Sequence, residues 1–322
     1  MSTLLSPVVL FFALGLVVAL LRSPMSVPQS FAKGLAIYLM MAIGLKGGVE
    51  MSKTALDGQV FAVFGAATIL SFGLPFIAYA ALRFTSGLSK TDAAATAGHY
   101  GSISIVTFVA AIEALRMAGV PSSGYLVAVA AIMETPAIIS ALWLAMRGSK
   151  AKSAEEASRD RGELAREVLL NASIVVLLGA LVIGAVAGED GFERLSPFFV
   201  APFQGVLCLF MLDMGLNAGR GLRRGWRKLG VAPIAFGLYM PLIGASIGAL
   251  CGMLIGMPAG DMALLMVLSA SASYIAVPAA MRLALPESDP SVYLTLSLGI
   301  TFPFNIAVGI PLYIAVATMM AG

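Results

Sequence analysis

Residues 91–115 read TDAAATAGHYGSISIVTFVAAIEAL, and residues 261–285 read DMALLMVLSASASYIAVPAAMRLAL. Both stretches are long and apolar enough to cross a bilayer, and both carry small polar residues and Tyr near the middle. Glycine is a poor helix former, serine hydrogen-bonds nearby backbone, and Pro278 cannot donate a helical hydrogen bond. We therefore expect two transmembrane helices that unwind at their centres, where only protein or a water-filled cavity can satisfy the free backbone groups.

The rest of the chain has the composition of a membrane protein. Of its 322 residues 59% are hydrophobic and 11% are charged, and the mean hydropathy is +0.95. A soluble domain carries about 25% charged residues and needs them to cover its surface. These values exclude a disordered chain, a secreted disulfide scaffold and a nucleic-acid-binding protein, and the net charge of +3 is too small to indicate a polyanionic partner. Cys208 and Cys251 lie inside apolar runs, where we expect packing residues.

Ten segments are candidates for membrane-spanning helices. They are residues 4–21, 30–46, 59–82, 91–113, 123–146, 168–187, 198–216, 230–255, 261–284 and 291–318. With the N-terminus outside, sixteen of the twenty Lys and Arg residues fall on the cytoplasmic side, in line with the positive-inside rule. We therefore expect both termini outside and residues 147–167 as the main cytoplasmic loop.

That loop divides the chain into two halves of five predicted spans, residues 1–146 and 168–322. Residues 41–48 (MAIGLKGG) resemble residues 212–219 (LDMGLNAG), and residues 102–106 resemble residues 273–277, both at a shift of 171 positions. An odd number of spans inverts the second half, and inverted repeats are a common plan among transporters. The repeat alone is also compatible with a duplicated channel, receptor or enzyme.

The two breaks are candidates for an anion site. Half-helices that meet at one place point N-terminal N–H groups and the positive end of the helix dipole at it, and serine hydroxyls add donors. Alternatively, the small residues in the breaks serve close packing between helices and not anion binding. The single histidine, His99, is more often a structural residue than a ligand. The candidate substrate-binding residues are Tyr100, Gly101, Ser102, Ser271, Ala272, Ser273 and Tyr274.

Polar residues in two other spans are candidates for a cation site. Glu134 lies near the centre of its span, and its repeat counterpart is Thr301, with Asn305 one turn later. A carboxyl group at the bilayer centre is costly and is a functional candidate by default. Oxygen ligands suit a hard cation, and Na⁺ is the natural choice. Alternatively, Glu134 carries a proton as the coupling ion, or its carboxyl group makes a structural hydrogen bond to a neighbouring helix. We expect Asp213 nearer the cytoplasmic end of its span, where it caps the helix or pairs with an arginine.

No catalytic grouping competes with this interpretation. One histidine cannot build a multi-histidine metal site, and the spacing of Ser102 from His99 is too little to indicate a nucleophile and its base. The chain has no phosphate-binding loop that would support ATP-driven pumping. We therefore expect no enzyme activity and no cofactor besides a coupling ion.

Three segments carry a family resemblance, namely residues 5–15 (LSPVVLFFALG), 98–111 (GHYGSISIVTFVAA) and 271–306 (SASYIAVPAAMRLALPESDPSVYLTLSLGITFPFNI). In them the chain resembles the sodium-dependent bicarbonate transporters of the cyanobacterial SbtA type. The resemblance implies ten transmembrane helices in two inverted five-helix repeats, with broken helices four and nine crossing at the midplane. It also implies a core domain and a gate domain, each built from both repeats, and a homotrimer.

The same resemblance implies Na⁺-driven import of bicarbonate across the bacterial plasma membrane by alternating access, and a PII-like regulatory partner on the cytoplasmic face. Carried over, the anion lies around Gly101, Ser102 and residues 271–274. The residues implied for Na⁺ are Ser104, Thr107, Glu134, Thr301 and Asn305. Alternatives are an Na⁺- or H⁺-coupled carrier of another small anion, and a passive anion channel.

Overall fold

The computed structural model describes residues 7–53, 57–146, 172–225, 229–274, 277–278, 281, 285 and 287–321. The predicted loop at residues 147–167 lies outside these ranges. The described part of the first half forms helices α1 (Pro7–Leu20), α2 (Gln29–Lys53), α3 (Gly58–Thr85), α4 (Lys90–His99), α5 (Ile105–Ala118), α6 (Leu126–Ile132) and α7 (Glu134–Met146).

The second half begins with α9 (Ala172–Phe199), α10 (Phe203–Gly225), α11 (Val231–Ile255) and α12 (Ala259–Ala270). It ends with one long helix, residues 290–321, whose middle is π-helical. Along the chain this helix consists of α14 (Pro290–Leu294), the π-helix η2 (Thr295–Thr301), α15 (Phe302–Phe304), the π-helix η3 (Asn305–Gly309) and α16 (Ile310–Ala321).

The fold is that of an all-helical polytopic membrane protein. Within the described residues six helical stretches are long and apolar enough to cross a membrane, and they are residues 29–53, 58–85, 126–144, 175–199, 231–255 and 290–321. Two further apolar helices, α1 and α12, are shorter. The prediction of a polytopic membrane protein is confirmed at this level, while the number of ten spans stays a prediction.

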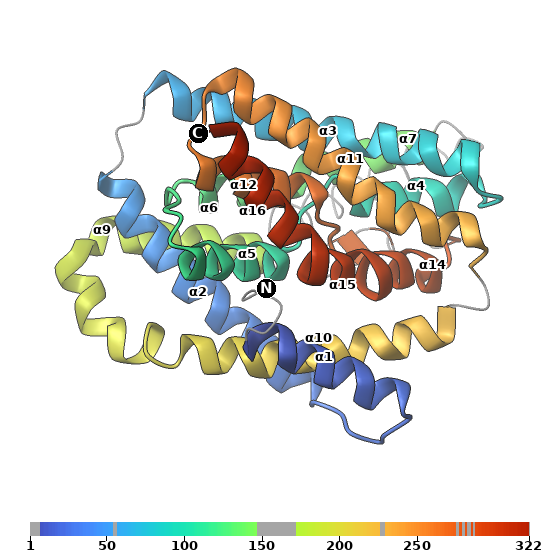
Figure 1. The fold of residues 1–322 in the computed structure, drawn as a ribbon, viewed down its shortest axis with the longest axis horizontal. Helices are drawn as coiled ribbons and strands as arrows, with labels where there is room; N and C mark the ends of the chain where they lie inside the picture. The colour runs from blue at the N-terminus through green and yellow to red at the C-terminus, as the bar shows by residue number, and fades with distance from the viewer. Residues whose placement is uncertain are drawn as a thin grey trace, which may run out of the picture.

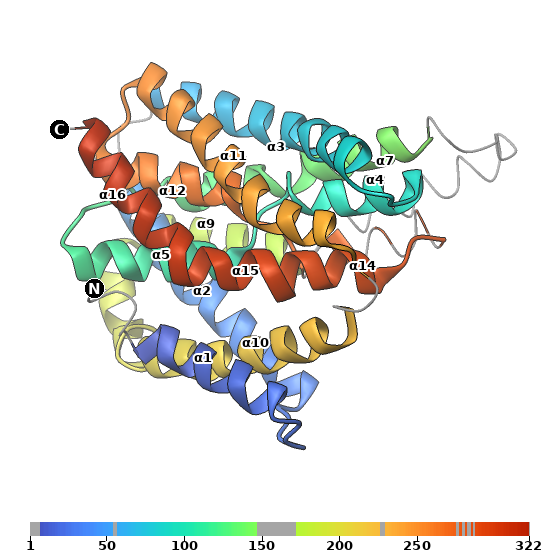
Figure 2. The same cartoon turned by 45° about the vertical axis from the view of Figure 1, so that its right-hand side comes forward.

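The helices form two groups (Figure 1). In one group α1 packs along α10, and α2 packs along α9. In the other, α3 packs on α4 and α7, while α11 packs on α12 and, with it, on α16. The turned view in Figure 2 keeps α1 and α10 together, apart from α3 and α11.

Glycines bring the helices of the first group into backbone contact. A Cβ atom at Gly44 of α2 would lie 2.7 Å from the carbonyl oxygen of Leu177 in α9, and one at Gly48 would overlap the carbonyl oxygen of Leu181. In the other pair, a Cβ at Gly215 of α10 would overlap the carbonyl oxygen of Phe12 in α1. Small residues allow transmembrane helices to approach this closely.

Helix α9 extends beyond the span predicted for it. The predicted span ends at residue 187, and Gly188 there has φ 62° and ψ −164°, which breaks the helix into two pieces. The second piece, residues 189–199, is also helical, although its charges indicated a connection. Apolar contacts stabilise it, since Phe199 stacks on Tyr38 of α2 with ring centroids 5.5 Å apart.

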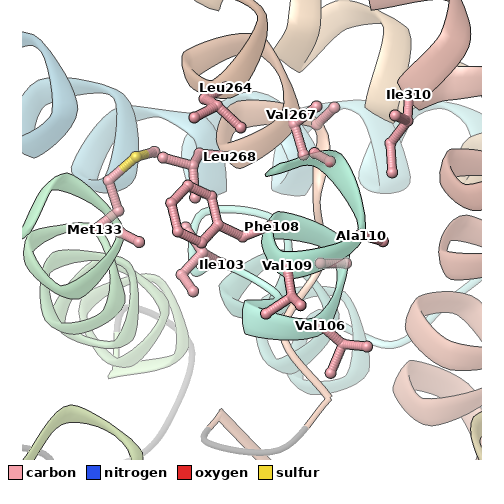
Figure 3. Packing of buried hydrophobic residues seen from close by; sticks show 14 of the residues in the cluster. Ile103, Val106, Phe108, Val109, Ala110, Met133, Leu264, Val267, Leu268 and Ile310 are labelled. Carbon is pink, nitrogen blue, oxygen red and sulfur yellow. The ribbon is translucent and has the colours of Figure 1, made fainter. Parts of the chain in front are cut away.

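The apolar core between the two groups closes around α5. Figure 3 shows the Phe108 ring of α5 among Ile103, Met133 and Leu268. All four side chains are buried and belong to one continuous cluster. This cluster holds the N-terminal half of α5 against the end of α12, and so fixes the position of the interruptions in both helices.

Candidate functional site

The first predicted break is confirmed. Helix α4 ends at His99, and α5 begins only at Ile105. Ser104 caps α5, because its side chain accepts a hydrogen bond of 3.2 Å from the N–H of Thr107. Five residues of non-helical backbone, from Tyr100 as the cap of α4 to Ser104 as the cap of α5, therefore separate two half-helices.

Contact with α3 requires a glycine in this break. A Cβ at Gly101 would overlap the ring of Pro75 and lie 2.6 Å from the carbonyl oxygen of Ser71. Pro75 sits inside α3, so this contact places the break directly against a continuous helix. Gly101 is therefore needed for packing, in addition to any role towards a ligand.

The second predicted break is also confirmed. Helix α12 ends at Ala270, and Ser271 has extended backbone with φ −80° and ψ 160°. The Ser271 hydroxyl donates a hydrogen bond of 3.0 Å to the carbonyl oxygen of Leu268, in the last turn of α12. Residues 271–274 are not helical.

The two breaks contact each other through backbone and side chains. The N–H of Ser273 donates to the carbonyl oxygen of His99 at 2.8 Å, and His99 Nδ1 donates to the carbonyl oxygen of Ser273 at 2.5 Å. The N–H of Ser104 donates to the hydroxyl of Ser271 at 3.0 Å. His99 also stacks on Tyr293, with centroids 4.6 Å apart. His99 thus fastens one break to the other, which agrees with the structural interpretation of a lone histidine.

Several buried polar atoms beside the breaks have no hydrogen-bond partner among the described residues. Ser102 is fully buried, and Thr107 is 1% exposed. Leaving such a group unpaired costs about 1–3 kcal/mol, so a ligand that pairs with it is favoured. The unpartnered atoms include the hydroxyls of Thr96, Ser102, Thr107 and Ser269, and His99 Nε2.

The remaining predicted substrate residues take different positions. Ala272 and Ser273 are buried within the second break. The ring of Tyr274 packs edge-on against Phe302, with centroids 5.3 Å apart. The Tyr100 hydroxyl hydrogen-bonds to that of Thr301 at 2.7 Å. The structure therefore brings Ser104 of the first break to Ser271 of the second, while the Tyr100 hydroxyl bonds to the C-terminal helix.

Two of the residues predicted for the cation already have protein partners. The Thr301 hydroxyl donates to the carbonyl oxygen of Gly237 at 2.6 Å and accepts from Tyr100 at 2.7 Å. Asn305 Nδ2 donates to the carbonyl oxygen of Ala270 at 2.9 Å, and its Oδ1 accepts from Tyr313 at 3.1 Å. Thr301 thus connects the first break to the long C-terminal helix, and Asn305 pairs with the last carbonyl of α12.

Glu134 begins α7 directly after another interruption. It is 5% exposed and makes no hydrogen bond or ion pair with the residues that the structure describes. Ser71 holds the interruption open, because its hydroxyl donates to the carbonyl oxygen of Met133 at 2.5 Å and accepts from the N–H of Ala137 at 3.2 Å. The described residues contain no cluster of three His, Cys, Asp or Glu side chains. A cation would therefore need hydroxyl and carbonyl oxygens, with Glu134 as the available carboxylate.

Three buried carboxylates, none of them a predicted site residue, hold connections and helices. Asp261 accepts hydrogen bonds from the N–H of Ser123 at 2.6 Å and from Tyr125 at 3.0 Å. Glu113 pairs with Arg116 on its own helix. Asp213 lies in the middle of α10, so it does not cap the helix; it accepts a hydrogen bond from Asn217 at 3.1 Å, and Arg220 acts on it electrostatically, in line with the arginine partner that we expected. The sequence pattern that identifies such buried carboxylates is an acidic residue within an apolar segment.

The comparison with protein-family models gives a match. A family model described as the Na⁺-dependent bicarbonate transporter superfamily covers residues 7–318. The comparison with curated proteins gives no match. The family match spans nearly the entire chain and includes both breaks and the long C-terminal helix.

Proposed function

The chain belongs to the Na⁺-dependent bicarbonate transporter superfamily, and from this premise we propose that it imports bicarbonate together with Na⁺. It is a membrane transporter and not an enzyme. The observation that carries the proposal is the contact between two unwound helix centres, with unpartnered hydroxyls buried beside it.

The breaks supply what a small monoanion needs. The first-turn N–H groups of α5 at Ile105 and Val106 have no acceptor within their own helix, and the dipole of α5 favours negative charge there. The Ser102 hydroxyl adds a donor that none of the described residues accepts from. We assign bicarbonate to the space around Gly101, Ser102 and residues 271–274, with Tyr100 at its edge.

The coupling ion is assigned to oxygens on the neighbouring helices. The Thr107 hydroxyl is unpartnered and lies one turn from Ser104. Glu134 adds the negative charge that a buried cation requires, and Thr301 and Asn305 complete the assigned set. A bound Na⁺ lowers the electrostatic cost of a nearby bicarbonate, and the effect is reciprocal.

The helix pairings support an inverted repeat. Exchanging the two halves turns the pair α1 and α10 into the pair α9 and α2, and turns α3 with α4 and α7 into α11 with α12 and α16. The glycines that match at a shift of 171, Gly44 and Gly215, make equivalent backbone contacts in the two pairs. We propose ten spans in two inverted repeats, of which α1, α2, α9 and α10 form the gate domain, and the remaining helices a core domain that rocks against it.

The assembly and orientation are part of the same proposal and rest on the family membership and the distribution of basic residues. They comprise a homotrimer in the bacterial plasma membrane, both termini outside, residues 147–167 on the cytoplasmic side, and a PII-like partner on that side.

One observation favours the proton as an alternative coupling ion to Na⁺. Glu134 is a buried carboxyl group without a described hydrogen-bond partner, so it could carry a proton in place of binding Na⁺. Uptake of labelled bicarbonate into proteoliposomes separates the possibilities. We expect replacement of external Na⁺ by K⁺ to reduce uptake at least tenfold. Uptake that follows a pH gradient in K⁺ would indicate proton coupling, and uptake that only equilibrates the label would indicate a channel.

A further inference from the structure

Two aspartates occupy equivalent positions in the two halves of the chain. Asp92 lies in the first turn of α4 and Asp261 in the first turn of α12, at a shift of 169 positions. Both helices end at a break, so each aspartate lies at the end of its half-helix that is remote from the proposed site. Asp261 is 2% exposed, and Asp92 is partly exposed.

Each aspartate accepts a hydrogen bond from the opposite half. Asp261 accepts from the N–H of Ser123, in the connection between α5 and α6, at 2.6 Å. Asp92 accepts from the N–H of Asp289, directly before α14, at 2.8 Å. Ser123 and Asp289 are separated by 166 positions, so exchanging the two halves turns one bond into the other. We refer to these two hydrogen bonds as the cross-half bonds.

The cross-half bonds lie at opposite ends of the molecule. Figure 1 shows α6 and α12 towards one end, and α4 and α14 towards the other. Both carboxylates are held by a second donor, since Asp261 also accepts from the Tyr125 hydroxyl at 3.0 Å, and Asp92 from that of Ser89 at 2.7 Å. The orientation of each aspartate is therefore fixed by bonds to both of its oxygens.

The segment that each aspartate binds leads to oxygens assigned to the cation. Helix α6 follows Ser123 and ends two residues before Glu134, while α14 and η2 lead from Asp289 to Thr301. Helix α12 packs on α6, and α4 packs on α14. When two neighbouring helices are joined at one end, their other ends cannot slide past each other. The cross-half bonds therefore set how far the cation oxygens lie from the breaks.

We propose that Asp261 and Asp92 are positioning residues, which hold the cation oxygens at the level of the breaks so that bound Na⁺ acts on the anion. The inference rests on the proposed function and adds to it the residues that set the coupling between the two ions. The attraction between two ions falls with their separation and with the amount of water between them. A half-helix released from its cross-half bond therefore weakens the coupling before it weakens the binding of either ion alone.

Asp261→Ala tests the inference in the purified transporter. The measured quantity is the coupling factor, which is the dissociation constant of bicarbonate without Na⁺ divided by that in saturating Na⁺. We expect this factor to fall at least about threefold, while the dissociation constant without Na⁺ stays within about twofold of the wild type. Asp261→Asn keeps an oxygen that accepts from Ser123, and should keep the coupling factor within about twofold of the wild type.

Asp57→Ala is the matched control. The Asp57 carboxylate also accepts from a backbone N–H at the start of a helix, that of Val60 at 3.0 Å, but both residues belong to α3 and its cap. We expect Asp57→Ala to lower the melting temperature and to leave the coupling factor unchanged. Asp92→Ala should lower the factor by about twofold, less than Asp261→Ala, because the assigned oxygens of the C-terminal helix carry no charge.

The outcomes separate the inference from the proposed function. If the alanine variants of Asp261 and Asp92 lose stability but keep the coupling factor of the wild type, both aspartates are structural only and the inference is wrong, while the proposed function stands. If Asp261→Ala does not fold, Asp92→Ala decides in the same way. If Na⁺ does not change bicarbonate binding to the wild type, the proposed function fails and the inference fails with it.

Discussion

The glycine-packed helix pairs and the two breaks use small residues in opposite ways. At Gly44 and Gly215 the helices continue, and the missing side chain lets another backbone approach. At Gly101 and Ser102 the backbone is not helical, and the buried Ser102 hydroxyl beside it has no described hydrogen-bond partner. The pairs gain stability from close contact, whereas the breaks keep buried hydroxyls that no described residue pairs with. Substitutions in the pairs should therefore affect folding, and substitutions in the breaks should affect transport.

Gly215→Leu should have the largest effect. Its side chain would overlap the backbone of α1 at Phe12, which costs about 3 kcal/mol or prevents assembly. We expect a lower melting temperature in detergent and little folded protein in the membrane. Gly221→Leu is the control on the same helix, because a Cβ there meets nothing within 4 Å. Equal melting temperatures for the two variants would contradict the close contact of α1 with α10.

Glu134→Gln should have the next largest effect, and on transport alone. The amide keeps the size of the carboxyl group and removes the charge proposed to balance Na⁺. We expect Na⁺-dependent bicarbonate uptake to fall more than tenfold, which corresponds to more than about 1.4 kcal/mol, with a melting temperature near that of the wild type. The control is Glu193→Gln, an exposed carboxylate outside the breaks. Normal uptake by Glu134→Gln would remove this residue from the coupling site.

Two serine substitutions give the sharpest contrast. The Ser102 hydroxyl has no described partner, so Ser102→Ala should raise the half-saturation concentration of bicarbonate about tenfold without loss of stability. Ser71 bridges Met133 and Ala137, so Ser71→Ala should cost about 1–3 kcal/mol of stability with a smaller effect on affinity. Melting curves and uptake kinetics on both proteins measure the difference. The reverse pattern would refute the division between structural and ligand-binding hydroxyls.

Tyr100→Phe should have the smallest effect. The variant loses one hydrogen bond to Thr301, which keeps its own bond to Gly237, so we expect a loss of about 1 kcal/mol of stability. The ring keeps its edge-on contact with Phe236, with centroids 4.7 Å apart. Thermal melting checks the stability. A tenfold loss of bicarbonate affinity would instead assign the Tyr100 hydroxyl to the substrate.

The sequence predicts the uninterrupted helices and the positions of the breaks well. Helix α11 covers residues 231–255 against a prediction of 230–255, because an apolar run between two glycines has clear ends. The breaks are predictable because clustered Gly and Ser weaken a helix locally. The helix at residues 189–199 is not predictable in this way, because its stability comes from contact with Tyr38, which lies far away in the sequence.

The candidate site is predictable only in part. The symmetry of the repeat suggests that the two breaks meet, but it cannot show that Asn305 pairs with Ala270, because packing decides which carbonyl an amide reaches. The expectation that Asp213 caps a helix is wrong because α10 continues to residue 225, beyond the predicted span end at residue 216, whereas its electrostatic interaction with Arg220 follows the expected pairing. Only the folded chain shows which hydroxyls have hydrogen-bond partners. Ser71 has two and Ser102 has none among the described residues, although both are serines.

The most direct test of the central claim is bicarbonate binding to the purified transporter with and without Na⁺. If both ions bind at the paired breaks, saturating Na⁺ should lower the dissociation constant of bicarbonate by about 5–150-fold, and bicarbonate should lower that of Na⁺ by the same factor. Thr107→Ala should reduce this factor. A dissociation constant for bicarbonate that does not change with Na⁺ would contradict the shared site.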